Sequence, residues 1–149
     1  MAQFGRPSAD TANPGVWIED GVGDNAVLFD EIDESAADNV DFIQSPAAPV
    51  AAVYVTKLSA LVDPAVDTGH VVRYRYGKNV AAGQVVTITV ELRQDYVSDP
   101  ATLGTLIHSE THADVPVGFT DGTFTLTIPE AALITDYANL FLRFNTTAV

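Results

Sequence analysis

The stretch VVTITVELR at residues 85–93 decides the fold class of this chain. Val86, Ile88, Val90 and Leu92 fall on one side of an extended chain, while the residues between them are mostly polar. A period of two is typical of a β-strand with one face in a core and the other in water. The sequence therefore predicts a strand at 85–93 with one buried and one solvated face.

Segments of similar character recur along the chain, separated by turn residues. The further strands are predicted at residues 26–33, 40–44, 53–61, 70–76, 105–111, 123–128 and 140–145. Asp121 and Gly122 are interpreted as the turn that precedes 123–128. The one helical segment is 129–137, because Pro129 and Glu130 are residues that favour a first helical turn.

Short strands at this spacing, with one brief helix, predict an all-β fold: an antiparallel β-sandwich of jelly-roll or immunoglobulin-like type. A chain of 149 residues is expected to form one core. Prolines and glycines interrupt any regular pattern before residue 24. We therefore expect an extended N-terminal arm at 1–25, anchored by Trp17 and Ile18, and a single sandwich domain at 26–149.

Composition and charge exclude several classes of function. Cysteine is absent, which excludes disulfides, thiolate zinc sites and cysteine nucleophiles. No apolar run approaches the roughly 18–20 residues of a membrane span. The net charge of −13, from 20 acids and seven cations, repels both nucleic acid and anionic membranes. Residues 1–50 carry ten of the acids against one cation, Arg6, so the first third is expected to form a distinct acidic surface.

The histidines and carboxylates form no recognisable catalytic or metal-binding motif. His108 and His112 have a spacing of four, but without the HExxH arrangement. On a strand they lie roughly 13 Å apart, too far to share one ion. His70 is interpreted as a structural residue, and no GxSxG elbow is present. We predict no catalytic residue, metal ligand or cofactor; the acids at 30–41 are interpreted as a solvated face, with a structural calcium site as the alternative.

Arginines are the most informative charged residues, because cations are so few. Arg73 and Arg75 share one face of their predicted strand, and Arg93 and Arg143 occupy positions predicted to be wet. If these strands are neighbours, the arginines form a basic stripe that pairs with the acidic first third of the same chain or of another copy. Ordinary cross-strand pairing with Glu91 is the alternative. The predicted partner-binding residues are Arg6, Trp17, Ile18, Arg73, Arg75, Arg93 and Arg143.

Several stretches together resemble a group of small virion proteins of tailed phages. They are GVW at 15–17, LFDEIDES at 28–35, DFIQSP at 41–46, HVVRYRYGK at 70–78, VELRQ at 90–94 and ITDYANLFLRF at 134–144. These are chiefly strand-and-turn patterns, and they cover most of the chain. The resemblance implies a structural protein of the capsid decoration, or cement, type and carries over no catalytic residue.

This resemblance implies a location on the capsid exterior and the major capsid protein as partner. Self-association is expected as well, with a trimer on a local three-fold axis as one arrangement. The alternative is a carbohydrate- or receptor-binding module of a phage tail. Such a module needs exposed aromatic side chains, for which Tyr54, Tyr76, Tyr96 and Phe119 are the candidates.

Overall fold

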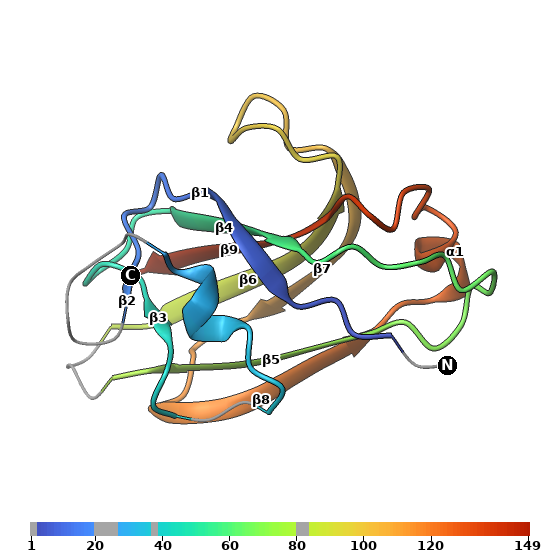
Figure 1. Cartoon of the computed structure of the whole chain (residues 1–149). Helices are drawn as coiled ribbons and strands as arrows, with labels where there is room; N and C mark the ends of the chain where they lie inside the picture. The colour runs from blue at the N-terminus through green and yellow to red at the C-terminus, as the bar shows by residue number, and fades with distance from the viewer. Residues whose placement is uncertain (1–2, 20–26, 37–38, 80–83) are drawn as a thin grey trace.

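The alternating stretch at 85–93 forms strand β6 (Val86–Gln94) inside a five-stranded antiparallel sheet of order β1-β4-β9-β6-β7 (Figure 1). The computed structural model describes residues 3–19, 27–36, 39–79 and 84–149. The remaining elements are β1 (Pro7–Ala12), β2 (Ile18–Glu19), the 3-10 helix η1 (Phe29–Ile32), β3 (Ile43–Gln44), β4 (Ala52–Leu58), β5 (Val71–Lys78), β7 (Thr105–His112), β8 (Gly118–Thr125), α1 (Ile128–Ala131) and β9 (Leu140–Ala148).

Strands β5 and β8 form a separate antiparallel pair that lies against the inner face of the five-stranded sheet (Figure 1). Strands β2 and β3 form a third, very short pair. The predicted fold class, an all-β antiparallel sandwich with one short helix near the C-terminus, is confirmed. No helix among the described residues is long and apolar enough to cross a membrane.

The predicted apolar face of β6 lies in the main core, as its alternation requires. Ile88, Val90 and Leu92 are all buried, and they pack with Leu140 and Leu142 of the neighbouring strand β9. The two strands pair without a register shift from Val86↔Ala148 to Gln94↔Leu140. This pairing of the two most regular strands forms the centre of the sheet.

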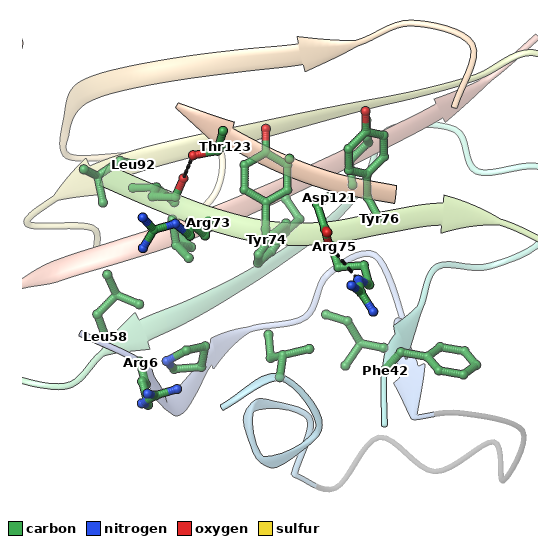
Figure 2. Close-up of a pocket in the computed structure, with 18 of the residues that line it drawn as sticks. Arg6, Phe42, Leu58, Arg73, Tyr74, Arg75, Tyr76, Leu92, Asp121 and Thr123 are labelled. Atoms are coloured by element: carbon green, nitrogen blue, oxygen red, sulfur yellow. Dashed lines mark hydrogen bonds and ion pairs between the residues drawn. The ribbon is translucent and has the colours of Figure 1, made fainter. Parts of the chain in front are cut away.

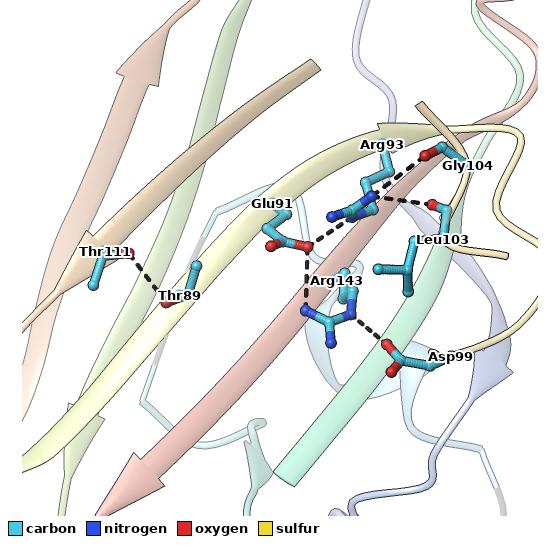
Figure 3. A network of polar contacts seen from close by, with 8 residues as sticks. All are labelled: Thr89, Glu91, Arg93, Asp99, Leu103, Gly104, Thr111 and Arg143. Atoms are coloured by element: carbon cyan, nitrogen blue, oxygen red, sulfur yellow. Dashed lines mark hydrogen bonds and ion pairs between the residues drawn. The ribbon is translucent and has the colours of Figure 1, made fainter. Parts of the chain in front are cut away.

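The opposite face of the same strands is solvated over only part of its length, so the prediction of a wet face holds only in part. Phe141 of β9 is 5% exposed and packs with Tyr96, Val53 and Val55 in a second apolar cluster. The segment 95–104, which leads from β6 to β7, folds back over this face (Figure 3). Its Tyr96 belongs to this cluster. The five-stranded sheet is therefore covered on both faces over part of its length.

Strand β1 occupies part of the segment predicted as a free arm. It pairs with β4 at the edge of the five-stranded sheet, from Pro7↔Leu58 to Ala12↔Val55. Residues 1, 2 and 20–25 of the predicted arm lie outside the described residues. Backbone pairing thus attaches the start of the chain to the domain.

The predicted strand at 26–33 is wrong, because residues 29–32 form η1 instead (residue 26 lies outside the described part). Leu28, just before η1, is 1% exposed and packs with Trp17 and Tyr54. Asp10 of β1 accepts hydrogen bonds from the Leu28 N–H (2.8 Å) and the Tyr54 hydroxyl (2.5 Å). These contacts between distant residues outweigh the local alternation of the segment.

Two smaller predictions are also wrong. Asp121 and Gly122 lie within β8, opposite Arg75 and Tyr74 of β5, and not in a turn. A Cβ atom on Gly122 would lie 2.3 Å from the Tyr74 ring, so glycine is needed for this close approach. The helix predicted at 129–137 is shorter: α1 covers Ile128–Ala131 and begins with a capping box between Thr127 and Glu130.

Candidate functional site

A cavity of about 2050 Å³ lies between the five-stranded sheet and the β5–β8 pair (Figure 2). Leu58, Leu92 and Leu142 of the larger sheet give it apolar walls. The N-terminal residues 3–7 and the segment 41–49 also line it. The two layers of the sandwich are thus in contact over only part of their area.

Strand β5 forms one long side of this cavity. All of its residues line the cavity, including those of both faces, such as Arg73 on one and Tyr74 on the other. Because neighbouring residues of a strand point to opposite faces, the cavity reaches around the strand's edge. Among the described residues, β8 is the only strand that pairs with β5.

Arg73 and Arg75 both project away from Tyr74 and Tyr76 in Figure 2. Arg75 donates from Nε to Asp121 Oδ1 (2.7 Å) and from Nη1 to Asn39 Oδ1 (2.9 Å). Its hydrogen bond lowers the pKa of the Asp121 carboxyl. Arg73 is exposed and has no ion pair or hydrogen bond within the described part of the chain.

The predicted basic stripe does not form. Arg93 and Arg143 lie in the five-stranded sheet, away from the β5–β8 pair that carries Arg73 and Arg75. They are also not wet: Arg93 is 7% and Arg143 8% exposed, because the segment 95–104 covers them. The alternative of cross-strand pairing with Glu91 is confirmed for Arg143, which lies directly opposite Glu91, whereas Arg93 pairs with Glu91 along the same strand.

Glu91 is the centre of a buried charge network on the outer face of the sheet (Figure 3). Its Oε2 accepts hydrogen bonds from Arg93 Nε (2.7 Å) and Arg143 Nη1 (3.2 Å). Arg143 Nε also donates to Asp99, and Arg93 Nη1 donates to the Leu103 carbonyl (3.3 Å). Burial opposes the charge on Arg143, but Asp99 and Glu91 outweigh it and raise its pKa. Two arginines and two acids thus neutralise one another inside the fold.

Arg6 and Trp17 also make contacts within their own chain. The Arg6 guanidinium donates to the backbone carbonyls of Glu34 and Asp33, which follow η1. The predicted anchoring role of Trp17 is confirmed: its ring is 5% exposed and packs against Tyr54 and Phe144. Its indole N–H has no acceptor among the described residues.

A local turn positions Trp17. The Asn13 side chain accepts from the Trp17 N–H (2.7 Å) and donates to the Trp17 carbonyl (2.8 Å). Gly15 lies in this turn so close to β4 that a Cβ atom would be 2.3 Å from the Val53 nitrogen. Ile18 begins the short strand β2 and is half-buried. The GVW motif at 15–17 is therefore a docking turn of the domain itself.

Two histidines of β7 make polar and stacking contacts with the β5–β8 side of the sandwich. His112 lies between two hydroxyls: Tyr74 OH is 2.6 Å from its Nε2 and Tyr76 OH is 3.0 Å from its Nδ1. His108 stacks on Phe124, with 4.2 Å between ring centroids, and its Nδ1 is 2.8 Å from Glu130. We call the region where these β7 histidines contact β5 and β8 the closed margin of the sandwich. The open margin is the opposite side of the cavity, between residues 3–7 and β5.

The closed margin changes the ionisation of two of its side chains. Burial, with smaller effects from Glu110 and Tyr76, raises the pKa of Tyr74 to about 12. Hydrogen bonds from Thr127, followed by one with His108, lower the pKa of Glu130 to about 2. Both shifts stabilise the form that the observed contacts require at neutral pH.

These histidines do not come together as a metal site. Among residues 3–19, 27–36, 39–79 and 84–149, no three His, Asp or Glu side chains form a group able to hold an ion. His70 contacts Tyr137, with 2.7 Å between Nε2 and the hydroxyl, and is remote in sequence from both β7 histidines. Asp38, in the acidic run considered for calcium, lies outside the described residues.

Sequence reasoning missed the cavity and the cover formed by 95–104. Both depend on how distant segments meet. An aromatic residue, Tyr96, shortly after β6 is the one feature of the sequence that is compatible with such a cover, and its burial is seen only in the structure. Two of the proposed carbohydrate-binding aromatics are buried, Tyr54 at 0% and Tyr96 at 5% exposure. Comparisons with protein-family models, curated proteins and solved structures found no match to this chain.

Proposed function

We propose that this chain is a non-enzymatic virion structural protein that binds the outside of a phage capsid and reinforces it. The observation that carries the proposal is the open margin, where a strand edge and apolar side chains line one cavity. A cavity bounded by a strand edge suits a segment of another protein, because strand edges and apolar grooves are common sites of peptide recognition.

The chemistry of the polar residues supports a binding role. His70, His108 and His112 contact tyrosines or a capping glutamate, in arrangements that rigidify the fold. Glu91 and Asp99 are engaged by arginines inside the sheet. No described nucleophile is aligned with a base and an orienting third residue in the manner of a triad. The motifs that resemble phage virion proteins, such as HVVRYRYGK at 70–78, give the proposal its capsid partner.

The capsid exterior is a suitable place for such a chain. Strands β6 and β9 form a fully paired centre, which gives a stable domain without disulfides. The net charge of −13 keeps the protein away from the enclosed genome, which is also anionic. On the capsid exterior, an acidic surface also favours solubility of the particle.

Co-sedimentation with capsids assembled without this protein tests the proposal. The purified protein is expected to pellet with the capsids, to saturate at a fixed ratio to capsid subunits, and to raise the temperature at which the capsids disrupt. A protein that stays in the supernatant at saturating capsid concentrations would contradict the proposal. In that case, binding on a glycan array would favour the tail-module alternative.

A further inference from the structure

The backbone of β5 has hydrogen-bonding groups that the described residues do not satisfy. The His70 carbonyl accepts from the Leu126 N–H at 2.9 Å, so residue 70 faces β8 as a bonded pair. Bonded and non-bonded pairs alternate along an antiparallel ladder. The N–H and C=O groups of Val71, Arg73 and Gly77, which fall at the alternate positions, therefore point away from β8.

These backbone groups lie along the edge of β5 that borders the cavity. Val71, Arg73 and Gly77 line the cavity, and outside the β5–β8 ladder their backbone groups make no hydrogen bond to a described residue. The ladder with β8 has no bulge, so the backbone groups of Val71, Arg73 and Gly77 lie in line along this edge and can act as a template for another strand. Open backbone groups and a cavity beside them are two independent features of one site.

We propose that an extended segment of the capsid subunit adds as a further strand to the edge of β5 that faces away from β8, through the backbone groups of Val71, Arg73 and Gly77. This inference rests on the proposed function, and it names the element through which the protein is held. The open backbone groups supply the hydrogen bonds, and the cavity receives the side chains of the added strand.

The site also indicates the sequence character of the bound segment. Side chains on one face of the added strand meet the apolar wall formed by Leu58, Leu92 and Leu142. Side chains on the other face lie beside Arg73, whose guanidinium has no partner among the described residues. The segment is therefore expected to alternate apolar residues with polar ones, with a carboxylate opposite Arg73.

Arg73→Pro is the sharpest test, because proline removes the one N–H at this position and places its ring on that edge. The ladder with β8 does not use this N–H, so the β5–β8 pair is retained. The affinity for capsids is expected to fall about tenfold or more. Arg73→Ala, which keeps the N–H and removes the charge, is expected to lose only about two- to fivefold.

Ser109→Pro is the matched control on the other edge of the sandwich. Val85 and Val149 exchange backbone hydrogen bonds (3.1 Å each). Glu91 lies an even number of residues from Val85, so its backbone N–H and C=O also point towards β9. Its β7 partner Ser109 therefore turns its N–H to the outer edge of β7, which does not line the cavity. Ser109→Pro is expected to bind capsids as the unchanged protein does.

Hydrogen exchange of the free and capsid-bound protein gives a second measurement. The amides of Val71, Arg73 and Gly77 are expected to exchange more slowly in the bound state, while the Ser109 amide is unchanged. Should Arg73→Pro fail to fold, Val71→Pro replaces it, because the first residue of a strand tolerates proline.

The outcomes separate this inference from the proposed function. If the unchanged protein does not pellet with capsids, both fall. If it pellets, but Arg73→Pro binds equally well and the three amides exchange at their free rate, strand addition is overturned and capsid binding stands. If the three amides slow with protein concentration in the absence of capsids, the occupant is a second copy of this chain, which also overturns the proposal.

Discussion

The closed and open margins of the sandwich differ in how the two layers meet. At the closed margin, His108 and His112 of β7 contact Phe124 and the tyrosines of β5 through stacked rings and short polar contacts. At the open margin, β5 and residues 3–7 line a cavity. Aromatic side chains large enough to span the layers are found where the sandwich is closed. The β5–β8 pair is therefore fixed along one side and available along the other.

The largest effect is expected from Phe124→Ala, which removes the ring that packs beneath His108. Phe124 is 6% exposed and belongs to the main core, so the free energy of unfolding should fall by about 3–5 kcal/mol. Chemical denaturation measures this loss. Phe119→Ala on the same strand is the control; Phe119 is 43% exposed, so a loss below about 1 kcal/mol is expected. Equal losses for the two variants would show that the ring of Phe124 stabilises the fold no more than an exposed ring on the same strand.

A smaller loss is expected from His112→Ala, which leaves the hydroxyls of Tyr74 and Tyr76 without their shared partner. Partly buried hydroxyls that lose a hydrogen bond should lower the free energy of unfolding by roughly 1–3 kcal/mol. Ser109→Ala, at an exposed position of the same strand, controls for the change of a β7 side chain. An unfolding midpoint equal to that of Ser109→Ala would show that the contacts of His112 with the two hydroxyls do not stabilise the closed margin.

Leu61→Ala probes the open margin, where Leu61 packs against the core but stays half-exposed beside the cavity. Its partial burial predicts a loss of about 1 kcal/mol in the free energy of unfolding. Thermal and chemical unfolding both measure it. A loss as large as that of Phe124→Ala would mean that the two margins are packed equally well in solution.

The last effect is confined to alkaline pH and concerns the closed margin. The pKa of Tyr74 is raised from its ordinary value of 10.0 to about 12 in the folded protein. Its contribution to stability is therefore fully present below pH 10, and declines as the pH rises from 10 to 12, because the unfolded chain releases this proton first. Unfolding midpoints measured across this range should fall less steeply in Tyr74→Phe. An unchanged slope would contradict the role of Tyr74.

Periodicity predicted what depends on local pattern. The strands around Val90 and Leu142 were placed correctly, with the correct inward face, because a two-residue period and a dry core determine both. The outward face of Arg93 and Arg143 was predicted wrongly, because a segment that folds back over a sheet leaves no period in the strands it covers. Burial of a face is a property of the tertiary structure.

Glycine and short apolar runs misled the prediction for a related reason. Gly122 has the local features of a turn residue, yet its role is to make room for the Tyr74 ring of the paired strand β5. The segment that forms η1 alternates as a strand does, but the burial of Leu28 against Trp17 determines its conformation. The cavity beside β5 had no signal at all in the sequence, because it is defined by layers that fail to meet.

The buried network of Arg93, Arg143, Glu91 and Asp99 affects how copies of the protein behave in salt solutions. It uses two of the seven cations and two of the 20 acids, so the rest of the sequence has five cations against 18 acids. Identical copies therefore repel one another through a field that salt screens over about 8 Å at physiological ionic strength. Adding salt should bring copies together, while it weakens attraction to any basic surface. Ionic strength thus moves these two kinds of contact in opposite directions.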